Sequence, residues 1–102
     1  MSKINYVKIC EDAGREYALT YKDCFAKYST KSYIVRFAQS RWLNLLNDFE
    51  TKELEIPKDK MEKCQKIFIK TFTNVMLDII DKMPKIDNPY VLKAINEAKK
   101  NK

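Results

Sequence analysis

The chain contains no histidine and a single glycine, Gly14, among its 102 residues. Histidine is the commonest metal ligand and titrates near neutral pH, so its absence excludes most hydrolytic, proton-shuttling and zinc chemistries. A single glycine cannot build the glycine-rich loops that cradle phosphate groups. We therefore expect a protein that is not an enzyme and that holds neither a cofactor nor a metal ion.

The sequence also lacks any apolar run close to the roughly 18 residues that a membrane-spanning helix needs. Its three cysteines, Cys10, Cys24 and Cys64, are an odd number without CxxC spacing. That pattern is typical of reduced thiols that fill the core of a cytosolic protein. We expect a cytoplasmic protein that does not contact a membrane.

Arginine is scarce, because the 20 basic residues comprise 17 lysines and three arginines. In an arginine-rich chain, the net charge of +6 would favour nucleic-acid binding. Here Lys, Asn and Ile, whose codons are rich in A and T, account for 34 residues and explain much of the excess. Small size and this coding bias favour an accessory protein of a phage, a virus or another mobile element, located in the host cytoplasm if viral.

The hydrophobic share of 45% and the 12 aromatic residues suffice for one hydrophobic core, so we expect a single domain over residues 1–102. Apolar residues recur at helical spacing in four segments. These predict helices over residues 3–28, 31–50, 58–83 and 89–99. Helices joined by short connections pack antiparallel. The sequence thus predicts an all-α fold, a compact antiparallel bundle of three long helices plus a short C-terminal helix.

Several residues mark the ends of these helices. Thr30, preceded by Ser29, is a capping type at the start of the second helix, and Pro57 suits the first turn of the third. Residues 50–57 lose the helical period and contain three glutamates against one lysine, which predicts an acidic loop. The basic tail over 99–102 is expected to fray.

Gly14 and the fourth helix each lead to an expectation about the packing. Gly14 lies at the border of the apolar arc of the first helix, where we expect a cost of about 1 kcal/mol relative to alanine and an irregularity of the helix. The fourth helix is expected to fold back as a cover on the bundle. Its predicted inner side comprises Tyr90, Val91, Ala94, Ile95 and Ala98.

Tyrosines line the apolar side of the first predicted helix. They are Tyr6, Tyr17, Tyr21 and Tyr28. A buried phenol needs a partner for its hydroxyl, so a fully interior stripe is rarely built this way. Two interpretations stay open: the rings lie at the rim of the core with their hydroxyls in water, or part of the stripe receives another chain.

Arg41 projects close to the apolar arc of the second helix, beside Trp42, and Asp48 points to the same side two turns later. Either its stem lies on the core and its head reaches solvent, or it belongs to an interface. Arginine, tryptophan and tyrosine often anchor protein binding. Our first hypothesis is therefore an inhibitor, adaptor or assembly factor that binds another protein. Its predicted contact residues are Tyr17, Tyr21, Arg41 and Trp42, with Arg36 at the rim.

Two further hypotheses stay open. The first is a nucleic-acid-binding module in which basic residues hold phosphates and tyrosines stack on bases. Its predicted residues are Arg15, Lys22, Lys27, Tyr28, Lys31, Tyr33 and Arg36. The second is a homo-oligomeric structural subunit, since the apolar positions of the first helix alternate by three and four as in a coiled coil.

Overall fold

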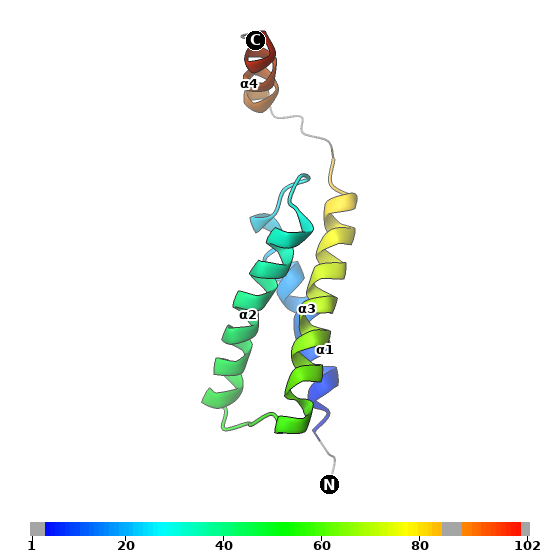
Figure 1. Ribbon diagram of the computed structural model, residues 1–102, viewed down its shortest axis with the longest axis vertical. Helices are drawn as coiled ribbons and strands as arrows, with labels where there is room; N and C mark the ends of the chain where they lie inside the picture. Colours follow the sequence, from blue (N-terminus) through cyan, green and yellow to red (C-terminus); the bar gives the residue numbers. More distant parts are fainter. Residues whose placement is uncertain (1–3, 85–88, 101–102) are drawn as a thin grey trace.

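The structure is a computed structural model that describes residues 4–84 and 89–100. Its elements in chain order are α1 (Tyr6–Thr20), the short 3-10 helix η1 (Lys22–Cys24), α2 (Lys31–Thr51), α3 (Lys58–Asp81) and α4 (Pro89–Lys100). In Figure 1, α1, α2 and α3 run up, down and up, which confirms the predicted all-α bundle with its short C-terminal helix. Among the described residues, no helix has the length and hydrophobicity needed to cross a membrane.

The helix starts follow from local capping. The Thr30 hydroxyl accepts a hydrogen bond from the Tyr33 N–H (3.1 Å), so Thr30 caps α2 as predicted. At the start of α1 the Asn5 side chain accepts from the Lys8 N–H (3.0 Å). α3 begins directly after Pro57. Residue 3 and tail residues 101–102, which the predicted boundaries include, lie outside the described residues.

The prediction that the first helix continues to residue 28 is wrong. The Tyr21 N–H makes the last helical bond, to the Tyr17 carbonyl, and after η1 the backbone becomes extended at Phe25. This conformation buries the Phe25 ring to 7% exposure, with its centroid 4.9 Å from that of Phe37 and 6.1 Å from that of Phe72. Burial of an aromatic ring between α2 and α3 thus outweighs continuation of the helix.

Gly14 sets the distance between α1 and α3. A Cβ atom at this position would lie 2.7 Å from the Phe68 carbonyl oxygen and 3.1 Å from the Thr71 Cβ. α1 continues through Gly14 without interruption, so the expected irregularity is wrong. The residue is a helical glycine whose missing side chain permits close backbone packing.

The two helices bury a pair of cysteines beside this contact. Cys10 on α1 and Cys64 on α3 are fully buried, and Cys64 is a neighbour that affects the titration of Cys10. Burial, together with the neighbouring Cys64, raises the pKa of Cys10 to about 12, so this thiol stays protonated and unreactive at neutral pH. Cys24, in η1, is exposed, which makes the prediction that it fills the core wrong.

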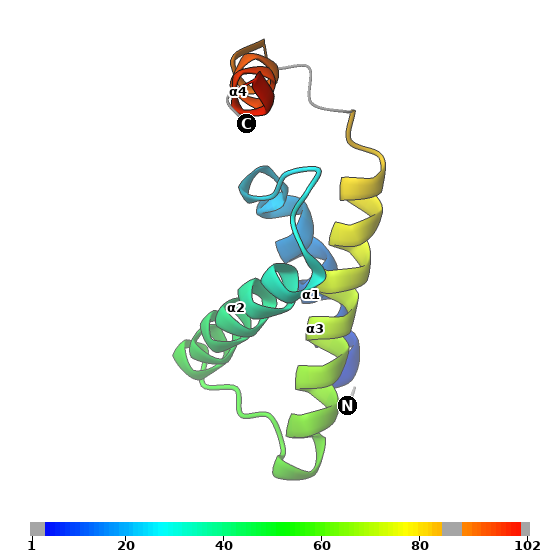
Figure 2. The same cartoon turned by 45° about the horizontal axis from the view of Figure 1, so that its top comes forward.

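α2 packs on α3 and ends in a motif that usually requires glycine. Leu54 N–H donates to the Phe49 carbonyl (2.8 Å) and Glu53 N–H to the Glu50 carbonyl (3.0 Å), the two bonds of a Schellman motif. Glu53 occupies the left-handed position with φ 59°. Figure 2 shows α2 leaning away from α3 toward this end, and the predicted loop follows.

α4 does not cover the bundle as the sequence predicted. Figures 1 and 2 place it beyond the end of α3, and the side chains of residues 93–99 are exposed. Of the predicted inner side, Tyr90 is 85% exposed and Ile95 is 42% exposed. Ala94 and Ala98 are also exposed, and the side chain of Val91 lies outside the described part of the chain. The four described residues of the predicted inner side are therefore exposed rather than packed on the bundle.

We expect Gly14→Ala to destabilise the bundle although alanine favours helix by about 1 kcal/mol. The new methyl group would lie 2.7 Å from a backbone carbonyl that cannot rotate away, so the cost should fall in the upper part of the range for overpacking, at about 2–3 kcal/mol. Urea denaturation should therefore show a net loss of about 1–2 kcal/mol. The exposed position in Glu16→Ala is the control, with a change within about 0.5 kcal/mol. An equally stable or more stable Gly14→Ala variant would contradict the close packing.

Candidate functional site

α1 and α2 both pack mainly on α3 and approach each other much less closely. Side chains fill the space between them, and we call this surface the α1–α2 seam. Its members at the rim of the core are Tyr17, Tyr21, Phe37, Arg41 and Asp48, of which all but Asp48 are half-buried. The seam brings together three of the five residues that the sequence analysis predicted for protein binding.

Arg41 is held over two aromatic rings of the seam. Its guanidinium carbon lies 5.3 Å from the ring centroid of Tyr21 and 5.4 Å from that of Phe37. One guanidinium nitrogen donates to the Tyr21 hydroxyl (3.4 Å), and Nε donates to the Ser40 hydroxyl (3.4 Å). Phe37 is in turn stacked on the buried Phe72, with centroids 5.8 Å apart, so the rings form a fixed platform for the cation.

The hydroxyl of Tyr17 is engaged by a carboxylate across the seam. It donates to Asp48 Oδ2 (3.3 Å), while its ring packs edge-on against Phe68 at 5.4 Å. Burial raises the pKa of Tyr17, and the negative charge of Asp48 and the hydrogen bond to it add to the effect. Tyr17 and Tyr21 thus lie at the rim of the core, with their hydroxyls bonded to protein groups. Tyr28, which the sequence placed on the same stripe, is 71% exposed on the loop after η1.

A hollow of about 350 Å³ opens at the end of the seam that lies farthest from η1. It is lined by Ile9, Tyr17, Leu45, Asp48, Phe49, Lys52 and Leu54. The lining is mostly apolar, with one carboxylate and one ammonium group at its edge. Its volume falls at the lower end of the range of small-ligand sites, and it can also accept one or two side chains of a partner.

The structure separates the other two predicted contact residues from the seam. Trp42 is 4% exposed and packs on Phe68 at 5.7 Å, so it is a core residue, contrary to the prediction. Arg36 is exposed but lies five residues from Arg41, about 140° around the helix. It lines a separate shallow hollow with Lys31, Ser32 and Val35.

Two of the seven residues predicted for nucleic-acid binding are engaged by groups of the protein itself. Lys27 Nζ donates to the carbonyls of Ile80 (3.3 Å) and Asp81 (2.9 Å), so it caps the C-terminal end of α3. Arg15 pairs with Asp12 on its own helix (3.6 Å). The other members, Lys22, Tyr28, Lys31, Tyr33 and Arg36, are exposed on η1, the following loop and α2.

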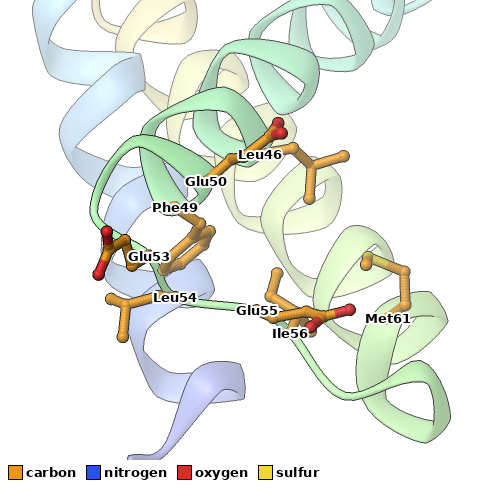
Figure 3. Close-up of a pocket in the computed structure, with 8 residues that line it drawn as sticks. All are labelled: Leu46, Phe49, Glu50, Glu53, Leu54, Glu55, Ile56 and Met61. Atoms are coloured by element: carbon orange, nitrogen blue, oxygen red, sulfur yellow. The ribbon is translucent and has the colours of Figure 1, made fainter.

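A second hollow, of about 460 Å³, lies between the end of α2, the acidic loop and the first turn of α3. We call it the glutamate-rimmed hollow. Figure 3 shows its lining residues: Leu46, Phe49, Leu54, Ile56 and Met61 supply apolar surface, and Glu50, Glu53 and Glu55 place carboxylates at separate points around it. This site is not predicted from the sequence, although the excess of glutamate over residues 50–57 is a signal for it.

Comparison of the chain with protein families, with curated proteins and with solved structures finds no match.

The contact between Tyr17 and Asp48 predicts how the pKa of Tyr17 should change when Asp48 is replaced. Asp48→Asn removes the charge, so the pKa of Tyr17 should fall while staying above its ordinary value, because the ring remains buried. NMR titration of ¹³C-labelled tyrosine measures this directly. In the wild type, the raised pKa also makes the free energy of unfolding fall as pH rises above about 10 and through the pKa of folded Tyr17. Asp12→Asn, at an exposed site outside the seam, serves as control; an unchanged Tyr17 pKa in Asp48→Asn would show that the two groups do not interact.

Proposed function

We propose that the protein acts without catalysis, by binding another protein through the α1–α2 seam, as an inhibitor, adaptor or assembly factor. The observation that carries this proposal is the state of Arg41. The residue is half-buried, its guanidinium is stacked on Tyr21 and Phe37, and none of the ion pairs in the described part of the chain includes it.

An arginine in this state is suited to receive a partner. A guanidinium has five N–H donors, and the two hydrogen bonds of Arg41 leave three of them free. The rings restrict the side chain before binding, so less conformational entropy is lost when a partner's carboxylate or carbonyl docks. Desolvation of a stacked arginine also strengthens such contacts, which explains the frequency of arginine and tyrosine at binding hot spots.

The shape of the seam restricts the partner's chemistry. The apolar hollow lies along the seam from Arg41, at the end that contains Ile9, Leu45 and Phe49. A segment that fits would carry an acidic or carbonyl group for Arg41 and an apolar side chain for the hollow. The charges of Lys52 and Asp48, which both line the hollow, offset each other, so the hollow favours no second acidic group.

Affinity capture from native lysate with quantitative mass spectrometry tests the proposal. Arg41→Gln should lower recovery of the partner by about tenfold or more, the size of a hot-spot loss. The matched control is Arg36→Gln, which removes the same charge on the opposite flank of α2 and should change recovery by less than about twofold. The fold should survive in both variants, because each lost cation–π contact costs about 0.5–1 kcal/mol. Equal recovery with both variants, or equal loss with both, would overturn the proposal.

A further inference from the structure

We propose that α4 of one molecule docks into the glutamate-rimmed hollow of a second copy, so that the protein forms a reciprocal dimer. This inference rests on α4 and on the α2–α3 connection and does not involve Arg41, although Phe49 and Leu54 line both this hollow and the one at the end of the seam. It joins an amphipathic helix with exposed apolar side chains to a hollow that has an apolar lining and the opposite charge.

The helix has the pattern of a docking element. Tyr90, Ala94 and Ala98 follow one another at intervals of four residues, and Ile95 borders the same face. All four side chains are exposed, with Tyr90 at 85%. An amphipathic helix that presents aromatic and aliphatic anchors at this spacing is one of the recurring modes of peptide recognition, in which the apolar face enters a hydrophobic groove.

The charges of helix and hollow are complementary. α4 carries three lysines and one glutamate, and in helical projection Lys93 and Lys99 flank the apolar face on opposite sides. The hollow has three glutamates and no basic residue in its lining. Since the whole chain has a net charge of +6, two copies repel each other at most of their surface. An acidic hollow is the place where a basic helix of another copy is attracted.

The hollow of the same chain is difficult for α4 to reach. The Met83 N–H still bonds to the Ile80 carbonyl (3.0 Å), so the chain is turning there, and six peptide units from Met83 to Pro89 span at most about 21 Å. Met61, which lines the hollow, lies 22 residues earlier, or about 33 Å along the helix axis. With the connection fully extended along the bundle, Tyr90 would stop about 10 Å short of Met61, and only the last turn of α4 would come level with it. The hollow of the same chain therefore cannot receive the whole face from Tyr90 to Ala98.

A twofold arrangement resolves this distance. α4 lies beyond one end of α3, whereas the hollow lies at the opposite end, beside the start of α3 (Figures 1 and 3). Two molecules side by side in opposite directions therefore bring each α4 to the other's hollow. Both contacts form at once, which is the isologous geometry of a twofold dimer that exchanges an element.

Sedimentation velocity of the full chain over a concentration series up to about 1 mM tests the proposal. The wild type should shift from 12.1 kDa toward twice that mass as concentration rises. Two charge-reversed variants, Glu53→Lys/Glu55→Lys in the hollow and Lys93→Glu/Lys99→Glu on α4, should each weaken association by about tenfold or more. These four side chains are exposed, so the variants should fold. The control is Glu16→Lys, on an exposed face of α1, which should associate as the wild type does.

Mixing the two variants shows whether α4 docks into the hollow of a second copy or into that of its own chain. In the mixed dimer, the charge-reversed α4 of one variant docks into the charge-reversed hollow of the other. The two elements that remain wild type face each other, so both contacts again join opposite charges. We expect the one-to-one mixture to associate about as strongly as the wild type, whereas each variant alone associates about tenfold or more weakly. A wild type that stays at 12.1 kDa, variants that associate like the wild type, or a mixture without recovery would overturn the proposal.

Discussion

At Gly14 the backbone of α1 lies against that of α3, and the rest of the architecture depends on this contact. The Phe68 carbonyl occupies the space where a Cβ would be, so no other residue type fits without a shift of one helix. The close approach buries Cys10 and Ala18 of α1 together with Cys64 of α3. α3 thereby becomes the helix on which both α1 and α2 pack.

The same constraint explains why the surface between α1 and α2 is unusual. With α1 held tightly on α3, α2 cannot approach both helices equally, and it packs on α3 while remaining farther from α1. Large rings bridge the remaining space, as in the contact of Tyr21 with Phe37 at 5.4 Å. Polar ends of these side chains meet at the rim, where Arg41 and Asp48 satisfy phenol hydroxyls. A surface of this composition is both stable in the monomer and suited to a partner.

Helical periodicity was sufficient to predict α2 and α3 almost to the residue, because their apolar faces are continuous and their starts carry Thr30 and Pro57. It failed at the end of α1, where the choice between helix and extended chain depends on Phe25 reaching a site formed by α2 and α3. For the same reason, projection of the residues around the helix axis could not show that Trp42 lies in the core and Arg41 at its rim. Burial depends on the distance to neighbouring helices, and that distance is set by Gly14, whose role only the packed structure reveals. The glutamate-rimmed hollow was likewise outside the reach of a linear pattern, since residues from α2, the loop and α3 form it together.

The most direct test of this account is an NMR measurement of proton contacts across the α1–α3 interface. The structure predicts strong nuclear Overhauser cross-peaks from the α protons of Gly14 to the Thr71 side chain and to the Phe72 amide proton, because a Cβ on Gly14 would lie 3.1 Å from Thr71 Cβ and 3.3 Å from Phe72 N. Their presence would place the two backbones in contact in solution. A folded helical chain without these cross-peaks would contradict the central claim.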